Sequence, residues 1–215
     1  MDREFYDERT ENRPRTKISQ FARSDFLNPT SKVRVELFPV NIYVFNHSNP
    51  KIDSEIESIP LDDSDILSHV SEGASQGIVQ GSHQGMNSLQ LFRKYELPEM
   101  VDWIYTCCEI IGEPAVQIHQ SWVNASTGDS FQIAHTHAHS KLSGVYYHNT
   151  IPDQHGGIVF NNPNPYSKMC MWGTEEGRHF PATPRTLVLF PSWLEHKTVK
   201  SRINTPRISV AFNAR

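Results

Sequence analysis

Residues 116–149 read VQIHQSWVNASTGDSFQIAHTHAHSKLSGVYYHN, and this stretch decides the fold. Short runs of β-branched and aromatic residues alternate in it with Ser, Gly, Asp and Asn, a pattern typical of strands joined by turns. The pattern continues to the C-terminus without helix-like periodicity, giving eight runs at 116–124, 131–138, 142–149, 157–161, near Phe180, 186–190, 195–199 and 207–213. The runs predict an all-β core, either an antiparallel sandwich or an open barrel, and leave its topology open.

The chain before this region supplies a few further elements. Residues 98–111 carry apolar side chains at helical spacing and stop at Gly112, so they predict a helix packed against the core. Residues 33–45 are β-branched and aromatic on both sides of Pro39, and they predict two strands with a break between them. In residues 48–88 Ser, Asp, Gly and Gln dominate, which predicts a long polar loop that is either plain surface or a lid over an active site.

Length and composition indicate one soluble globular domain. The 215 residues, 37% of them apolar and 20% charged, are enough for a core that needs no disulfides. We expect a charged N-terminal arm at 1–32, followed by a single domain at 33–215. Three cysteines, of which Cys107 and Cys108 are adjacent, form no disulfide framework and favour a cytoplasmic location.

Charge and hydropathy argue against two classes of partner. The net charge is −4 and no block of Lys or Arg stands out, which argues against binding along a nucleic-acid backbone. The N-terminus lacks the apolar segment of a secretory signal, and no stretch approaches the roughly 18 apolar residues of a membrane-spanning helix. We therefore expect neither a nucleic acid nor a membrane as partner.

Histidines are spaced at intervals of two residues in the second run. His135, His137 and His139 would point to one face of a strand. The outer two would lie about 13 Å apart, too far for one ion, whereas neighbours about 6.6 Å apart can converge to the nitrogen–metal distance of about 2.1 Å. The spacing is consistent with a metal-binding pair, either 135/137 or 137/139, or with a metal-free polar cluster.

His196 and Arg207 form a second candidate pair. If the turn lies within residues 201–206, the two residues oppose each other across a hairpin, about 5 Å apart on one face. The last run then places polar and small side chains on that face, namely Arg207, Ser209, Ala211 and Asn213. An arginine beside a histidine on a polar face indicates either a lined cavity or a surface strand.

Five motifs follow one another in a specific order. They are His135-Thr-His137, SGVYY at 143–147, GGIVF at 156–160, LVLFPSWLEH at 187–196 and RISVAFN at 207–213. In this order they resemble the 2-oxoglutarate/iron(II) oxygenase superfamily and, more distantly, the prolyl hydroxylases. The resemblance covers about residues 85–213 and implies a double-stranded β-helix, or jelly roll.

The resemblance also implies two sets of site residues. Iron(II) would be held by His135, His137 and His196, with His139 outside the site. The distal carboxylate of 2-oxoglutarate would be bound by Arg207 and Ser209, with Tyr147 assisting and Asn124 touching or supporting the cosubstrate. Three protein ligands leave metal positions for a chelating 2-oxo acid and oxygen, and an arginine fork suits a carboxylate.

The second metal position departs from the commoner pattern of the superfamily. His137 stands where Asp or Glu is usual, so three neutral imidazoles would leave the full +2 charge on the metal. Zinc, nickel or copper could then compete with iron through their intrinsic affinity.

The resemblance implies an enzyme that uses molecular oxygen, converts 2-oxoglutarate to succinate and hydroxylates a small-molecule or peptide substrate. Similarity to prolyl hydroxylases favours a peptide or an amino acid as this substrate. One alternative is a cupin-like three-histidine metal enzyme without 2-oxoglutarate, which would have no general use for Arg207. Another is a metal-free β-sandwich binding module whose histidines form a polar surface.

Overall fold

The computed structural model describes residues 39–60, 79–80, 91–126, 131–164 and 177–215. Its helices are α2 (Pro50–Glu57), α4 (Leu91–Lys94) and α5 (Pro98–Ile110). Its strands are β1 (Tyr43–Asn46), β2 (Val79–Gln80), β3 (Ile118–Ser126), β4 (Leu142–Tyr147), β5 (Ile158–Asn161), β6 (Gly177–Phe180), β7 (Thr186–Pro191), β8 (His196–Thr198) and β9 (Arg207–Ala214). The predicted arm at 1–32, the strand predicted before Pro39 and most of segment 48–88 lie outside the described residues.

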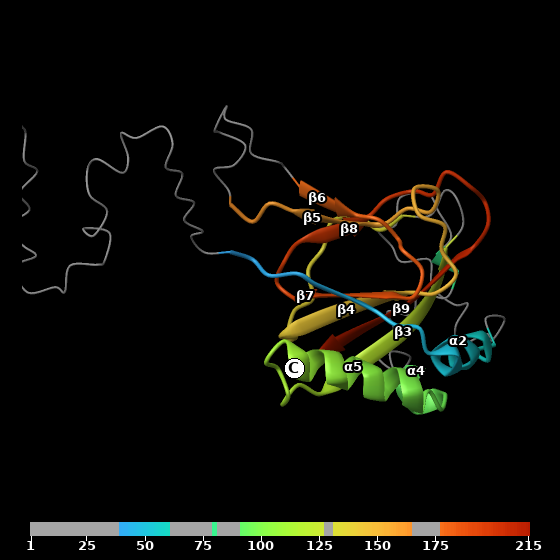
Figure 1. Ribbon diagram of the computed structural model, residues 1–215. Coiled ribbons are helices and arrows are strands. Elements are labelled where there is room, and N and C mark those ends of the chain that lie inside the picture. The colour runs from blue at the N-terminus through green and yellow to red at the C-terminus, as the bar shows by residue number, and fades with distance from the viewer. Residues whose placement is uncertain (1–38, 61–78, 81–90, 127–130, 165–176) are drawn as a thin grey trace, which may run out of the picture. The chain divides into compact units, whose positions relative to one another are not determined.

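The strands form two antiparallel sheets that face each other (Figure 1). The larger sheet has the order β1-β7-β4-β9-β3-β2, and the smaller sheet has the order β6-β5-β8. From β4 onward the chain winds between them: β4 is in the larger sheet, β5 and β6 are in the smaller, β7 is in the larger, β8 is in the smaller and β9 is in the larger. This winding is that of a double-stranded β-helix and confirms the predicted jelly roll.

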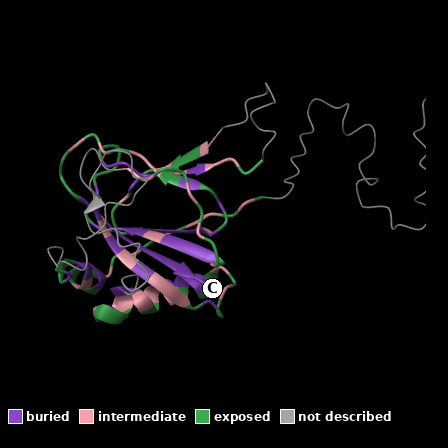
Figure 2. Cartoon of the chain, turned by 180° about the vertical axis from the view of Figure 1, so that it is seen from behind, coloured by how far each residue is buried: buried purple, intermediate pink, exposed green. Residues whose placement is uncertain are grey.

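The larger sheet is covered on both faces, which explains the sequences of its central strands. Nearly all residues of β4, β7 and β9 are buried, as Figure 2 shows. In β7 the run TLVLF has no polar residue after Thr186, as expected for a strand without a solvent-exposed face. One face of this sheet lines the space between the sheets, and the other packs against helices.

Helix α5 covers the outer face of the larger sheet and forms the main hydrophobic core with it (Figure 1). Its buried side chains are Met100, Ile104, Cys107 and Cys108, and the cluster includes Leu189, Val210 and Phe212 from the sheet. Burial raises the pKa of Cys107 to about 12 and that of Cys108 to about 11, so both thiols stay protonated. The helix predicted at 98–111 is thereby confirmed as a core element.

Helix α2 lies within segment 48–88, where the sequence predicts only a loop. Asn49 caps the helix by accepting from the backbone N–H of Lys51, and Pro50 begins it. Ile52 and Ile56 are buried in the same core as α5. Residues 50–57 are therefore part of the folded domain rather than a loop.

Residues 131–138 do not form the predicted strand. The structure assigns them only an isolated bridge between His135 and His196. The backbone on either side of His135 is irregular, so this segment lies as an edge beside β8 without a continuous ladder. In the described residues, no helix has both the length and the apolar character that crossing a membrane requires.

The α5 core gives a test of the fold. Ile104 is fully buried, so Ile104→Ala should lower the free energy of unfolding by about 2–5 kcal/mol through lost burial and a cavity. Ile110 lies on the same helix but is 68% exposed, and Ile110→Ala should change the free energy of unfolding by about 0.5 kcal/mol or less. Denaturant unfolding of the two variants would measure both values, and equal losses would contradict this placement of α5.

Candidate metal and cosubstrate site

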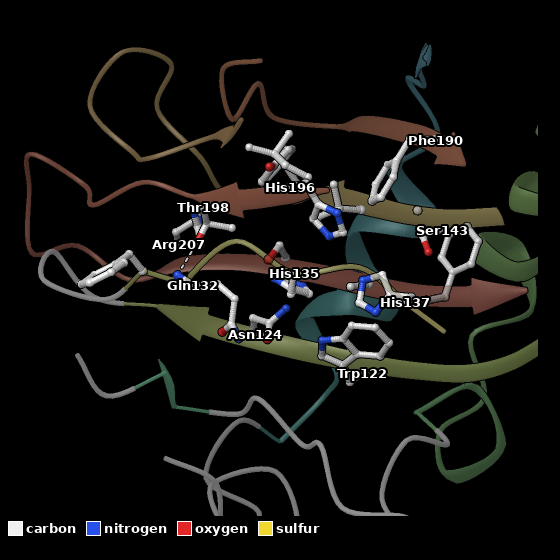
Figure 3. A pocket seen from close by; sticks show the side chains of 18 residues that line it. Trp122, Asn124, Gln132, His135, His137, Ser143, Phe190, His196, Thr198 and Arg207 are labelled. Atoms are coloured by element: carbon white, nitrogen blue, oxygen red, sulfur yellow. Dashed lines mark hydrogen bonds between the residues drawn. The ribbon is translucent and has the colours of Figure 1, made fainter. Parts of the chain in front are cut away.

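A cavity lies between the two sheets, and the inner face of the larger sheet forms one of its walls (Figure 3). Strands β4, β9 and β3 supply this wall in register. One inward-facing row across these strands consists of Tyr147, Ser209 and Asn124. The next inward-facing row, two residues along each strand, consists of Val145, Ala211 and Trp122. Because residues two apart on a strand share a face, the register explains why these side chains all point inward.

The segment 131–138 and strand β8 form the facing wall. The backbone N–H and C=O of His135 pair with those of His196, at N–O distances of 2.9 and 3.0 Å. Further along, the His137 N–H donates to the Ser192 carbonyl at 2.9 Å, and Thr198 N–H donates to the Gln132 carbonyl at 3.1 Å. These bonds fix an otherwise irregular segment, because each pins its backbone to neighbouring residues of the fold.

Three histidines converge in the cavity. Candidate ligand nitrogens of His135, His137 and His196 all lie within 4.8 Å of one another, and the ring centroids of His135 and His196 are 4.4 Å apart. Figure 3 shows the three rings gathered at one place. His139 is not in this group and has a φ of 64°, in the turn that follows. Of the two pairs that spacing leaves open, the fold brings together 135 and 137.

Hydrogen bonds set the tautomers of two of these rings. His135 Nδ1 lies 2.8 Å from the Ile133 carbonyl oxygen, and His196 Nδ1 lies 2.8 Å from the Leu194 carbonyl oxygen. A carbonyl oxygen only accepts, so each Nδ1 carries the proton and each Nε2 keeps a lone pair. This arrangement orients metal-binding histidines in proteins generally.

Burial keeps the histidines uncharged. Desolvation, with repulsion from the neighbouring histidines, lowers the pKa of His137 to about 3 and that of His196 to about 4. Burial also lowers the pKa of His135. The three imidazoles are therefore neutral near pH 7, which is the form that binds metals.

Arg207 lies in the same cavity with Tyr147 beside it. Arg207 is 4% exposed and its guanidinium donates to the Gly156 carbonyl. Burial raises the pKa of Tyr147 to about 12, and the charge of Arg207 partly offsets this rise. Burial lowers the pKa of Arg207, although a guanidinium stays protonated at neutral pH. Among the described residues that line the cavity, Arg207 is therefore the one buried positive charge, and Tyr147, Ser209 and Asn124 lie close to it in the sheet.

The predicted hairpin between His196 and Arg207 is wrong. Strand β8 pairs with β5 in the smaller sheet, whereas β9 pairs with β3 and β4 in the larger. Residues 199–206 cross from one sheet to the other instead of making a tight turn between paired strands. His196 and Arg207 still line one cavity, from facing walls, and the inward alternation predicted for Arg207, Ser209 and Ala211 is confirmed.

Several lining residues escaped the sequence reasoning. They are Trp122, Gln132, Phe190 and Thr198, among others. Trp122 and Thr198 had a usable signal, since each lies two residues along a strand from a predicted site residue, Asn124 and His196. Gln132 had none, because its segment lacks a regular alternation.

The residues present fit a divalent metal and a dicarboxylate cosubstrate. Three imidazole nitrogens are suitable ligands for first-row metals such as iron, nickel or zinc. The buried Tyr147 hydroxyl has no hydrogen-bond partner among the described residues. Buried hydroxyls usually have one, and a carboxylate bound at Arg207 would supply it.

Part of the chain is similar to a described protein family. The family model described as "Putative 2OG-Fe(II) oxygenase" matches residues 120–213. None of the curated proteins matches the chain. The chain spans 49% of the length of a 2OG-Fe(II) oxygenase family oxidoreductase from Burkholderia pseudomallei, with 18% identity over 50% of this chain and a TM-score of 0.41.

Two other solved structures are similar over most of the chain. A Pseudomonas putida prolyl-4-hydroxylase is 13% identical, with a TM-score of 0.50 over 82% of this chain and 92% of that chain. EctD from S. alaskensis, with 2-oxoglutarate and 5-hydroxyectoine, is 14% identical, with a TM-score of 0.53 over 82% of this chain and 72% of that chain. These likenesses support the fold. The resemblance seen in the sequence is thereby confirmed: residues 120–213 match the family model of 2OG-Fe(II) oxygenases, and the solved structures share its fold.

Proposed function

We propose that the chain is an iron(II)- and 2-oxoglutarate-dependent oxygenase that couples decarboxylation of 2-oxoglutarate to hydroxylation of a substrate. One observation carries the proposal: three neutral, converging histidines and a buried arginine line the same cavity from facing walls. The family match over residues 120–213 supports it. A metal-free binding module would gain nothing from holding three uncharged imidazoles together in a cavity.

His135, His137 and His196 would hold the metal, and their Nε2 atoms are the expected donors at 135 and 196. When bound, iron and the 2-oxo acid would supply the oxygen-activating chemistry. The protein contributes orientation, because Ile133 and Leu194 hold two of the rings in the correct tautomer.

Arg207 would bind the distal carboxylate of 2-oxoglutarate through two charge-assisted hydrogen bonds. Ser209 and Tyr147 would add donors from the neighbouring positions of β9 and β4. Asn124 would complete this end of the cavity from β3. Burial of Arg207 strengthens the attraction, since little water competes for the carboxylate.

The substrate would present an uncharged group to the metal. Apart from Arg207 and the histidines, the described residues that line the cavity are apolar or neutral, with Trp122, Phe190 and Gln132 prominent. A peptidyl side chain would fit such a lining better than a free zwitterionic amino acid, whose charges would need partners. The order of motifs shared with prolyl hydroxylases favours a peptidyl or amino-acid substrate and does not choose between the two.

The metal ligands can be tested directly. His135→Ala, His137→Ala and His196→Ala should each abolish tight one-to-one binding of Ni(II), because each removes one of three donors. His139→Ala is the matched control and should leave the affinity nearly unchanged. Isothermal titration of the metal-free protein would measure this. Loss of binding in His139→Ala with retention in His135→Ala would contradict the proposed site.

Arg207 separates the use of 2-oxoglutarate from other three-histidine enzymes. Arg207→Lys keeps the positive charge. It replaces the planar guanidinium, which can make two parallel hydrogen bonds to a carboxylate, with an ammonium group that makes a single contact. Losing one charge-assisted bond costs about 1.5–3 kcal/mol, or roughly 10- to 150-fold in affinity. The Michaelis constant for 2-oxoglutarate should rise by about this factor, with metal affinity nearly unchanged. An unaltered constant would favour the cupin-like alternative.

Metal and cosubstrate should bind cooperatively. We expect 2-oxoglutarate to raise the melting temperature of the Ni(II)-loaded protein more than that of the metal-free protein, because part of its binding energy would come from the metal. At 100 times its dissociation constant, a ligand specific for the folded state adds about 2.7 kcal/mol. Differential scanning calorimetry would compare the two shifts, and equal shifts would place the acid elsewhere.

A further inference from the structure

One short segment, residues 148–157, contacts Arg207 and its neighbours in the chain, and we call it the β4–β5 connection. The Arg207 guanidinium donates to the carbonyl of Gly156 within it. A Cβ atom at Gly156 would lie 1.7 Å from the Val199 carbonyl oxygen, so only glycine fits there. The close approach of Gly156 to the backbone of Val199 places the Gly156 carbonyl within hydrogen-bonding reach of the Arg207 guanidinium.

His155 ties the same connection to the chain just before Arg207. Its side chain is buried, with 3% exposure, and bonded at both nitrogens. Nδ1 accepts from the Ile151 N–H at 2.8 Å, so Nε2 carries the proton and donates to the Thr205 carbonyl at 2.9 Å. Thr205 lies two residues before Arg207, and this bond therefore fixes the start of β9.

Asn149 holds the backbone on both sides of Arg207. Its Oδ1 accepts from the Ile208 N–H at 2.9 Å, and its Nδ2 lies 3.5 Å from the Pro206 carbonyl. The backbone N–H of His148 also donates to the Ile208 carbonyl at 3.0 Å. Thus the β4–β5 connection holds the guanidinium and both neighbouring residues of Arg207.

We propose that the β4–β5 connection positions Arg207 for 2-oxoglutarate, with His155 as its principal positioning residue. The proposal rests on the proposed function, since it concerns the arginine of that site. A planar fork makes two parallel bonds to a carboxylate only when its plane and position are fixed. The bonds described above join the connection to residues 205–208 and none involves the three converging histidines, so the effect is expected on the cosubstrate and not on the metal.

Two variants of His155 separate its two bonds. In His155→Gln the amide nitrogen can replace Nε2 and keep the bond to Thr205. In His155→Asn the shorter side chain can replace Nδ1 and keep only the bond to Ile151. We expect His155→Asn to bind 2-oxoglutarate about 3- to 10-fold more weakly, the equivalent of one ordinary hydrogen bond, and His155→Gln to stay within about twofold. Both should bind Ni(II) as the parent does.

The measurement is isothermal titration of 2-oxoglutarate into Ni(II)-loaded protein, which reports binding without turnover. His47→Asn is the matched control, because His47 is bonded in the same way, with Nδ1 accepting from Asn49 N–H at 3.1 Å and Nε2 at 2.8 Å from the Tyr146 hydroxyl. It should keep the affinity for 2-oxoglutarate. If His155→Asn does not fold, Asn149→Ala, which removes the bond to Ile208, should show the weakened binding instead.

Arg207→Lys, titrated alongside, separates the two proposals. If Arg207→Lys weakens 2-oxoglutarate binding while His155→Asn and Asn149→Ala leave it unchanged, the positioning role is refuted and the proposed function stands. Equal weakening by His155→Asn and His155→Gln would also overturn that role, since it would point to a general loss of packing. If Arg207→Lys has no effect, the proposed function itself fails.

Discussion

The two backbone hydrogen bonds between His135 and His196 are the constraint on which the site depends. They join residues 61 positions apart (196 − 135) and bring their rings to a centroid distance of 4.4 Å. His137 follows because its own N–H is bonded to Ser192, a few residues before His196. Together with the bonds between Gln132 and Thr198, this bridge gives the irregular segment 131–138 its place beside β8, and so brings the three nitrogens together.

The strength of the local signal decided which elements the sequence could predict. Continuous apolar runs such as β7 and the periodic helix α5 appear close to their predicted bounds. Helix α2 was missed because only Ile52 and Ile56 mark its buried face within a segment dominated by polar residues, although Asn49 and Pro50 form a recognisable start. At 131–138 the alternating histidines imitate a strand, yet only His135 makes a bridge.

Physical reasoning from the sequence predicts less of the candidate site than of the fold. Spacing alone left two histidine pairs open, and the resemblance to a family supplied the choice. The separation of 11 residues between His196 and Arg207 fits a hairpin and a crossover equally well, because sequence distance does not say which sheet each strand joins. The row that joins Tyr147, Ser209 and Asn124 depends on the pairing of three strands, which no local pattern encodes.

The facing walls of the cavity have a mechanical consequence. The histidines belong to the smaller sheet and to the edge pinned beside it, whereas Arg207 and Tyr147 belong to the larger sheet. A ligand bound both to the histidines and to Arg207 would therefore connect the smaller sheet to the larger one across the cavity. Its departure would remove the contact through bound ligand between the histidines of one wall and Arg207 of the other.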